Sequence, residues 1–222
     1  MMIATIFMNM NRRIYEFYIA DTHFGHSNII RFDYRPFSDI YQMEEAMVML
    51  WNAAVRKSDH VYILGDFCWE KSDEWLRILK QLNGQKTLIL GNHDLSNFPA
   101  ELKKQFADIT PYKEIVDNGR DNSNRKVLMS HYPIPFYKHA NNQKYYSLCG
   151  HVHATAENDI LEKLIKELRD NYQHDVGTHS ANCGQIYNVG ACLPWMQYTP
   201  RTLDEIIKRW DECHPNGQIW RP

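Results

Sequence analysis

The sequence predicts an α/β fold in which strand–helix–strand units come first and a strand-rich half follows. Apolar runs rich in aromatic and β-branched residues are separated by segments with helical patterning, which is typical of parallel strands joined by crossover helices. These early strands are expected at 14–20, 61–64 and 87–90. Later strands are expected at 112–116, 126–129, 145–149 and 185–189. Few helices separate the first of the later strands, so at least one antiparallel pair is expected.

Helical patterning and end signals locate the intervening helices. Ser38 or Asp39 is a candidate N-cap for the first, Asn83-Gly84 fits the end of the second, and Thr202 to Glu205 forms a capping box before the last. The helices are expected at 40–57, 72–82, 99–106, 160–171 and 203–210. The polar segment 158–182 holds one of these helices together with either a loop that caps the site or an exposed excursion.

Length and composition indicate an ordinary globular protein. The 222 residues are 44% hydrophobic and 23% charged, and no repeat or Pro/Gly/Ser-rich linker divides them. We therefore expect a single domain over 1–222. A net charge of −2 argues against a generic nucleic-acid or membrane binder. A phosphate substrate stays compatible with this charge, because bound metal ions supply positive charge locally.

Cysteine usage and the start of the chain bear on its location. The five cysteines are odd in number and include no C-x-x-C pair, which disfavours a disulfide framework. No apolar run approaches the length of a membrane span. Arg12 and Arg13 follow the short apolar start rather than precede it, the reverse of a signal peptide. A cytoplasmic protein is expected.

Polar residues directly follow each of the three early strands. Asp21-Thr22-His23 comes after the first, Gly65-Asp66 after the second, and Gly91-Asn92-His93-Asp94 after the third. Ligands of open α/β sheets bind beyond the carboxyl ends of the strands, so these side chains are expected to reach one rim. The glycines allow the sharp turns that bring side chains to a common centre.

Two histidine clusters follow later strands, namely His131 after 126–129 and Gly150-His151-Val152-His153 after 145–149. Imidazoles, carboxylates and one amide together suit divalent ions such as Mn, Fe, Zn or Co. The absence of cysteine from the set argues against a structural zinc site. Each motif alone is weak, and it is their joint order, each after a strand, that predicts a metal centre.

This series of motifs resembles the calcineurin-like metallophosphoesterase superfamily. Asp21-Thr-His-Phe-Gly-His26 and Tyr187-Asn-Val-Gly190 are similar to its small bacterial-type phosphoesterases. The resemblance implies a two-sheet β-sandwich core flanked by helices, with four layers in the order α/β/β/α. The stretch from Gly65 to Glu70 lacks the D-R-G continuation of many protein phosphatases, which argues against that role.

The resemblance also implies a role for each motif residue. Seven metal ligands form two sets that share one carboxylate: Asp21, His23 and His153 in the first, Asn92, His131 and His151 in the second, and Asp66 as the bridge. His93 would contact the phosphate and assist the leaving group, with Asp94 orienting it. We expect two divalent ions, manganese first and iron, zinc, cobalt or nickel as alternatives. Such ions lower the pKa of water from 15.7 to about 7, which provides hydroxide at neutral pH.

Substrate-binding candidates follow the first motif. His26, Asn28 and Arg35 are within reach of it in sequence, and Arg35 suits a phosphate oxygen. The alternative is that His26 and Asn28 only fix the loop while Arg35 is solvated. Tyr132 beside His131 either stacks on a nucleobase or packs at the rim.

The sequence therefore predicts a metal-dependent phosphoric ester hydrolase that acts on a phosphodiester or phosphomonoester. A small phosphorylated substrate, such as a nucleotide, is the expected partner. A nuclease is the less favoured alternative, because no extended basic stretch is present. The remaining alternative is a non-catalytic metal-binding scaffold of the same fold. A homodimer stays open, and the loops rather than the fold determine the substrate.

Overall fold

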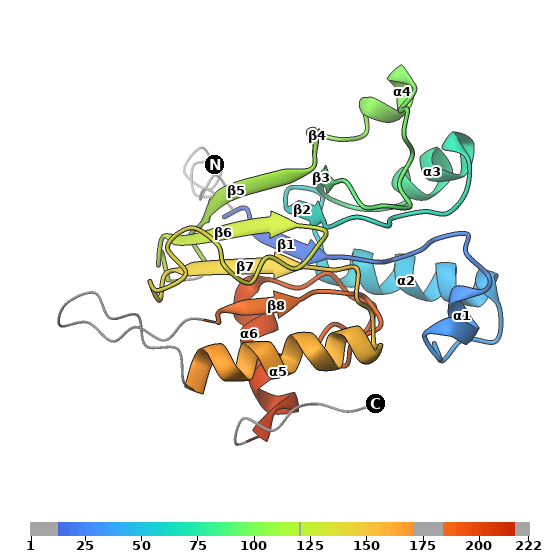
Figure 1. Ribbon diagram of the computed structural model, residues 1–222. Coiled ribbons are helices and arrows are strands. Elements are labelled where there is room, and N and C mark those ends of the chain that lie inside the picture. Colours follow the sequence, from blue (N-terminus) through green and yellow to red (C-terminus); the bar gives the residue numbers. More distant parts are fainter. Residues whose placement is uncertain (1–12, 120, 171–183, 216–222) are drawn as a thin grey trace, which may run out of the picture.

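The computed structural model describes residues 13–119, 121–170 and 184–215, and the strands in these ranges form two sheets of four strands each (Figure 1). The first sheet consists of β1 (Glu16–Ile19), β2 (His60–Ile63), β3 (Gln85–Ile89) and β4 (Asp108–Thr110), in that order. The second sheet consists of β5 (Tyr112–Asp117), β6 (Arg125–Ser130), β7 (Tyr145–Cys149) and β8 (Ile186–Asn188), in that order.

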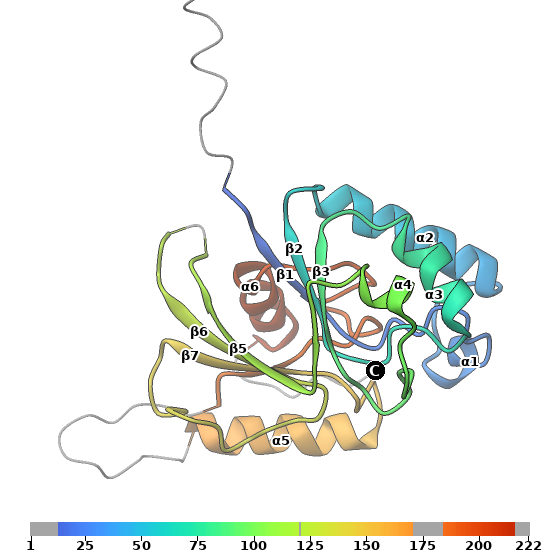
Figure 2. The same ribbon diagram turned by 90° about the horizontal axis from the view of Figure 1, so that it is seen from above.

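Helices flank the two sheets. They are α1 (Ile29–Phe32), α2 (Ile40–Ala54), α3 (Ser72–Leu79), α4 (Ala100–Lys103), α5 (Ala156–Asp170) and α6 (Leu203–Cys213). Viewed from above, α2 and α3 lie outside the first sheet and α5 lies outside the second (Figure 2). The α/β class and the two-sheet core flanked by helices are thus confirmed.

Strand direction determines where the functional loops meet. All pairs of the first sheet are parallel, because helices carry the chain back between strands. The loops that follow β1, β2 and β3 therefore leave the same edge. In the second sheet β5 and β6 are antiparallel, as predicted, whereas β6–β7 and β7–β8 are parallel. The loops after β6 and β7 consequently leave the second sheet on one side as well.

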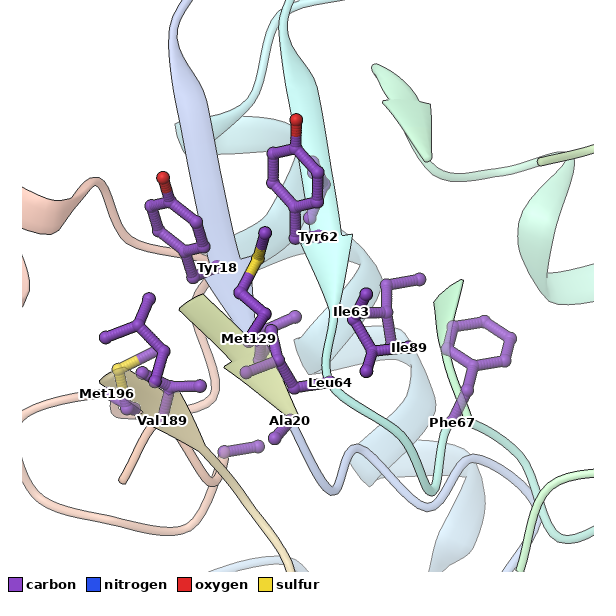
Figure 3. Packing of buried hydrophobic residues seen from close by; sticks show 14 of the residues in the cluster. Tyr18, Ala20, Tyr62, Ile63, Leu64, Phe67, Ile89, Met129, Val189 and Met196 are labelled. Atoms are coloured by element: carbon purple, nitrogen blue, oxygen red, sulfur yellow. The ribbon is translucent and has the colours of Figure 1, made fainter. Parts of the chain in front are cut away.

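The two sheets join along β1 and the segment after β8. The Ala20 N–H donates to the Val189 carbonyl at 2.9 Å, and the Ala191 N–H donates to the Ala20 carbonyl at 2.8 Å. Between the sheets, the rings of Tyr18 and Tyr62 stack at 5.6 Å near Met129 (Figure 3). This buried apolar packing holds the strand ends of both sheets together.

Several predicted boundaries shift in the structure. The first predicted helix ends at Ala54 instead of residue 57, because Val55 is extended. Its N-cap is Asp39, whose carboxylate accepts from the Gln42 N–H at 2.9 Å. The capping box of α6 is present. The elements α1 and β4 were not predicted, since four and three residues are too few to show a periodicity.

The segment 158–182 is described only in its first part. There α5 begins at Ala156, four residues before the predicted start, and ends at Asp170. Residues 171–182, on which the predicted loop or excursion falls, lie outside the described residues. Among the described residues, no helix is long and apolar enough to cross a membrane. The cysteines of that part of the chain, namely Cys68, Cys149, Cys192 and Cys213, are free thiols.

Candidate metal centre

The seven predicted ligands all lie on loops that follow strands. Two come from the loop after β1, one each from those after β2, β3 and β6, and two from the loop after β7. In that order they are Asp21 and His23, then Asp66, Asn92 and His131, then His151 and His153. Because the parallel strands and the β1–β8 junction align these loops, residues up to 132 positions apart are brought to one place.

The first set of ligand atoms converges tightly. Asp21, His23, Asp66 and His153 each offer one donor atom, and these atoms lie within 4.8 Å of one another. The Nε2 atoms of His23 and His153 are 3.2 Å apart. Nε2 of His153 is 3.7 Å from Oδ1 of Asp21. Two imidazoles and two carboxylates at this spacing match the ligands that transition-metal ions take in proteins.

The second set converges on His131. Its Nε2 lies 2.9 Å from Oδ1 of Asn92 and 3.6 Å from Oδ2 of Asp66. The His151 ring stands 5.1 Å from the His131 ring, centroid to centroid. Oδ2 of Asp66 is also 3.7 Å from Nε2 of His23, so this carboxylate lies between the two sets.

The protonation of the imidazoles fits a cation. Nδ1 of His131 is 2.8 Å from the Leu64 carbonyl, and Nδ1 of His153 is 2.9 Å from the Asp33 carboxylate. Both partners accept hydrogen bonds, so each Nδ1 carries a proton and each Nε2 faces the cluster. At His131 that Nε2 meets the amide oxygen of Asn92, which is also an acceptor. The lone pairs of His131 Nε2 and Asn92 Oδ1 therefore face each other, and a metal ion bound by both would relieve their repulsion.

The electrostatics of the predicted ligands agree with this arrangement. Burial lowers the pKa of His153, but the hydrogen bond to Asp33 and the nearby Cys192 and Asp21 outweigh it and raise the pKa to about 11. Burial and the neighbouring His153 hold the pKa of His23 far below its usual range. His153 therefore donates a proton towards His23 across the 3.2 Å gap. A metal ion held by His23 and His153 would take the place of that proton.

Most of the ligand residues adopt a backbone conformation that is uncommon for their type. Five of the seven have positive φ angles: Asp21 (54°), His23 (52°), Asp66 (51°), His151 (73°) and His153 (46°). Such strain is concentrated at functional sites and is maintained by the surrounding structure. Here backbone pairs such as His23 N–H to the Asp66 carbonyl at 3.0 Å hold the loops. At Gly65 (φ 83°) a Cβ would overlap the His131 ring, so a glycine is required there.

The chain matches a known family of proteins. The sequence pattern of the calcineurin-like phosphoesterases matches residues 17–182, a range that contains all seven predicted ligands. The chain belongs to the calcineurin-like phosphoesterase family. This membership confirms the predicted family and supports metal-dependent phosphoesterase chemistry in general.

The chain is also similar to three individual proteins. An uncharacterised protein of Methanocaldococcus jannaschii is 44% identical over 85 residues, or 37% of this chain and 47% of that protein. The gene 66 protein of Mycobacterium phage L5 is 30% identical over 80 residues, or 35% of this chain and 38% of that protein. The chain thus aligns with less than half the length of each. A solved protein of unknown function from Aquifex aeolicus has a TM-score of 0.54 and 26% identity, covering 88% of this chain and 99% of that one.

Asp94 organises the two loops that carry Asp66 and His93. Its carboxylate accepts from the backbone N–H groups of Gly91 at 2.8 Å, Phe67 at 2.9 Å and Asp66 at 3.2 Å. Burial raises the pKa of Asp94 to about 6. The His93 N–H in turn donates to Oδ1 of Asp66 at 2.9 Å. Asp94 thus places His93 through the backbone, and a direct effect on its ring stays a prediction.

Arg35 lies behind the ligand cluster and is buried, so it is not the solvated residue that the sequence left as an alternative. It is 4% exposed, and its guanidinium donates to the carbonyls of Thr22 and Asp21 at 2.9 Å each. Nε and Nη2 also donate to Oδ2 of Asp33 at 3.0 and 2.8 Å. With its donors engaged in this way, Arg35 supports the first motif, and the predicted phosphate contact is disfavoured.

The other two substrate candidates lie nearer the opening. His26 stacks on Trp69 with their ring centroids 4.1 Å apart. The His26 ring also lies 5.5 Å from the ring of His23. Asn28 is exposed at the start of α1, and its side chain makes no capping bond there. Contact of either with substrate stays a prediction.

Two residues at this site were missed by sequence reasoning, namely Asp33 and Trp69. Asp33 stands ten positions after His23 in an irregular stretch, so no motif spacing signals it. Trp69 follows Asp66 at the point where the sequence departs from the protein-phosphatase pattern. The missing D-R-G continuation was therefore the sequence signal that could have drawn attention to Trp69.

Proposed function

We propose that the chain is a dinuclear, metal-dependent hydrolase of a small phosphoester, with a nucleotide as the favoured substrate. The observation that carries the proposal is the position of Asp66. Its Oδ2 lies 3.7 Å from Nε2 of His23 and 3.6 Å from Nε2 of His131, so one carboxylate faces both ligand sets. Family membership supports phosphoester chemistry in general, and the two-metal count and the substrate class belong to this proposal.

The donor set is suited to an anionic substrate. Two divalent ions, when bound, would offset phosphate charge and make water more acidic. Asp21 and Asp66 are the carboxylates of the set, whereas Asn92 adds an oxygen without negative charge. The site therefore keeps a positive balance for a phosphate once it is loaded. Manganese is the proposed ion, with iron, zinc, cobalt and nickel as alternatives that metal analysis distinguishes.

His93 is the proposed group that assists departure of the leaving oxygen. It follows the ligand Asn92 directly, its backbone is held by Asp66, and its ring stands 6.1 Å from that of His23. A proton donated there stabilises the developing alkoxide. This role does not require His93 to coordinate a metal, which separates it from the other histidines of the site.

The direct test is an assay of the purified protein with Mn²⁺ against bis-p-nitrophenyl phosphate and p-nitrophenyl phosphate. Turnover that depends on added metal and is removed by a chelator is expected for at least one of them. The ratio of the two rates distinguishes a diesterase from a monoesterase. If metal analysis shows a loaded site and neither compound is hydrolysed, the non-catalytic scaffold becomes the better interpretation. Size-exclusion chromatography with light scattering tests separately for the homodimer that the sequence leaves open.

A further inference from the structure

Trp69 is an exposed aromatic residue at the edge of the ligand cluster. Its ring lies 4.5 Å from that of His93 and 6.2 Å from that of His23, between centroids. It is 45% exposed, whereas the other tryptophans of the described ranges, Trp51, Trp75, Trp195 and Trp210, are 8% exposed or less. Single exposed aromatic residues are common, and it is the position of Trp69 beside His93 and His23 that places an exposed aromatic face at this site.

The position of Trp69 is fixed before any substrate binds. Its backbone N–H donates to the Phe24 carbonyl at 2.8 Å, and Phe24 forms a parallel bridge with Cys68. His26 stacks on the indole at 4.1 Å with an interplanar angle of 11°. The loops after β1 and β2 thus hold the ring in place. A fixed ring loses little side-chain entropy when a ligand contacts it.

We propose that Trp69 binds a planar group on the leaving side of the substrate, so that the enzyme prefers phosphoesters whose ester arm carries a nucleobase. This inference rests on the proposed function, because it depends on His93 acting at the leaving oxygen. Because Trp69 adjoins His93, a group attached to the leaving oxygen would lie next to the indole ring. Every nucleobase offers a flat π surface, and stacking on aromatic side chains recognises it without a sequence code.

A second exposed ring borders the other ligand set. Tyr132 is half exposed, and its ring stands 4.6 Å from that of His151 and 5.2 Å from that of His131. One exposed aromatic residue therefore adjoins each ligand set, Trp69 beside the first and Tyr132 beside the second. A diester carries two ester arms, and Tyr132 is placed to contact the arm that Trp69 does not.

The test compares substrates that share a leaving oxygen and differ only in the base. Adenosine 5′-monophosphate and ribose 5-phosphate form such a pair, and their methyl esters form the equivalent pair for a diesterase. Wild type, Trp69→Ala and Trp69→Phe are assayed with Mn²⁺, with Tyr41→Ala on α2 as the exposed-aromatic control. Trp69→Ala is expected to lower kcat/KM for the nucleotide by about 5- to 150-fold more than it lowers kcat/KM for ribose 5-phosphate.

A binding measurement complements the assay. Adenosine 5′-monophosphate is expected to quench tryptophan fluorescence in wild type. Trp69→Phe keeps an aromatic surface but lacks the reporter, so its quenching is lost while its preference for the nucleotide is largely kept. The inference is overturned if Trp69→Ala lowers kcat/KM equally for both substrates, or if wild type shows no preference for the substrate with the base. Either result leaves the phosphoesterase proposal standing. Absence of any metal-dependent turnover in wild type contradicts both.

Discussion

Asp33 accepts a hydrogen bond from Nδ1 of His153 at 2.9 Å, on the side of the imidazole that faces away from the ligand cluster. The same carboxylate receives Nε and Nη2 of Arg35, and Arg35 also binds the carbonyls of Thr22 and Asp21. A chain of contacts therefore runs from the first motif through Arg35 and Asp33 to His153. It fixes the ring orientation and the tautomer of a proposed metal ligand.

The first prediction concerns Asp33. Asp33→Asn replaces the charged acceptor of His153 by a neutral amide, so metal affinity at the first ligand set is expected to fall by about 10- to 100-fold. Metal titration by calorimetry measures this directly, without reference to catalysis. Asp73→Asn, an exposed change on α3, is the matched control. Unchanged affinity in Asp33→Asn would show that Asp33 does not act through His153.

The second prediction distinguishes the two roles considered for Arg35. Removing this buried guanidinium in Arg35→Ala leaves Asp33 without its cation and the Asp21 and Thr22 carbonyls without their donor. The free energy of unfolding is expected to fall by about 3–5 kcal/mol, as for other broken buried pairs. Urea denaturation measures it. A variant of normal stability with a raised KM would instead restore the substrate-binding role.

The third prediction concerns the carboxylate between the two sets. Asp66→Ala removes the Oδ2 atom that faces both His23 and His131, and it also removes the acceptor of the His93 N–H. Elemental analysis after dialysis is expected to show loss of two-metal occupancy. Full occupancy by two ions in this variant would contradict a bridging role. Circular dichroism is the control for folding.

The fourth prediction separates proton transfer from metal binding. His93→Ala is expected to retain its metals and to lose about 10²–10⁴ in kcat, the usual range for a general acid or base. The deficit should be smaller for p-nitrophenyl esters, whose good leaving group needs little assistance, than for alkyl esters. Retained metal together with full activity on alkyl esters would remove His93 from the proposed chemistry.

The fifth prediction lies outside the site, at the start of β1. Burial and then the nearby Asp117 raise the pKa of Glu16 to about 7, and its Oε2 has no hydrogen-bond partner. The folded chain thus keeps a proton that the unfolded chain loses near pH 4.5. Stability from this group is full below pH 4.5 and falls as the pH rises to about 7.

Glu16→Gln removes that titration. The variant is therefore expected to lose less stability than wild type between pH 5 and pH 8, and to be the more stable of the two at pH 8. Urea unfolding at both pH values gives the comparison, with the exposed Glu167→Gln as control. Parallel pH dependence in Glu16→Gln and wild type would show that Glu16 ionises normally.

The strands and the candidate ligands were predictable because both leave local signals. Strands of a parallel sheet are buried on both faces, so β1, β2 and β3 read as short apolar runs. The ligands follow those runs within a few residues, at the strand ends. Boundaries were less certain, and α1 and β4 were missed, because elements of three or four residues show no periodicity.

Other features depended on contacts between distant parts of the chain. Asp33 meets His153 across 120 positions, and Trp69 adjoins His93 only because their two loops follow neighbouring parallel strands. The same packing directs Arg35 inward, although its sequence position suited the substrate. By itself the sequence determined the chemical groups and the strands that carry them, since these are local properties. The tertiary structure decided which groups converge, which support them and which stay exposed beside them, because orientation and burial arise only when the sheets pack together.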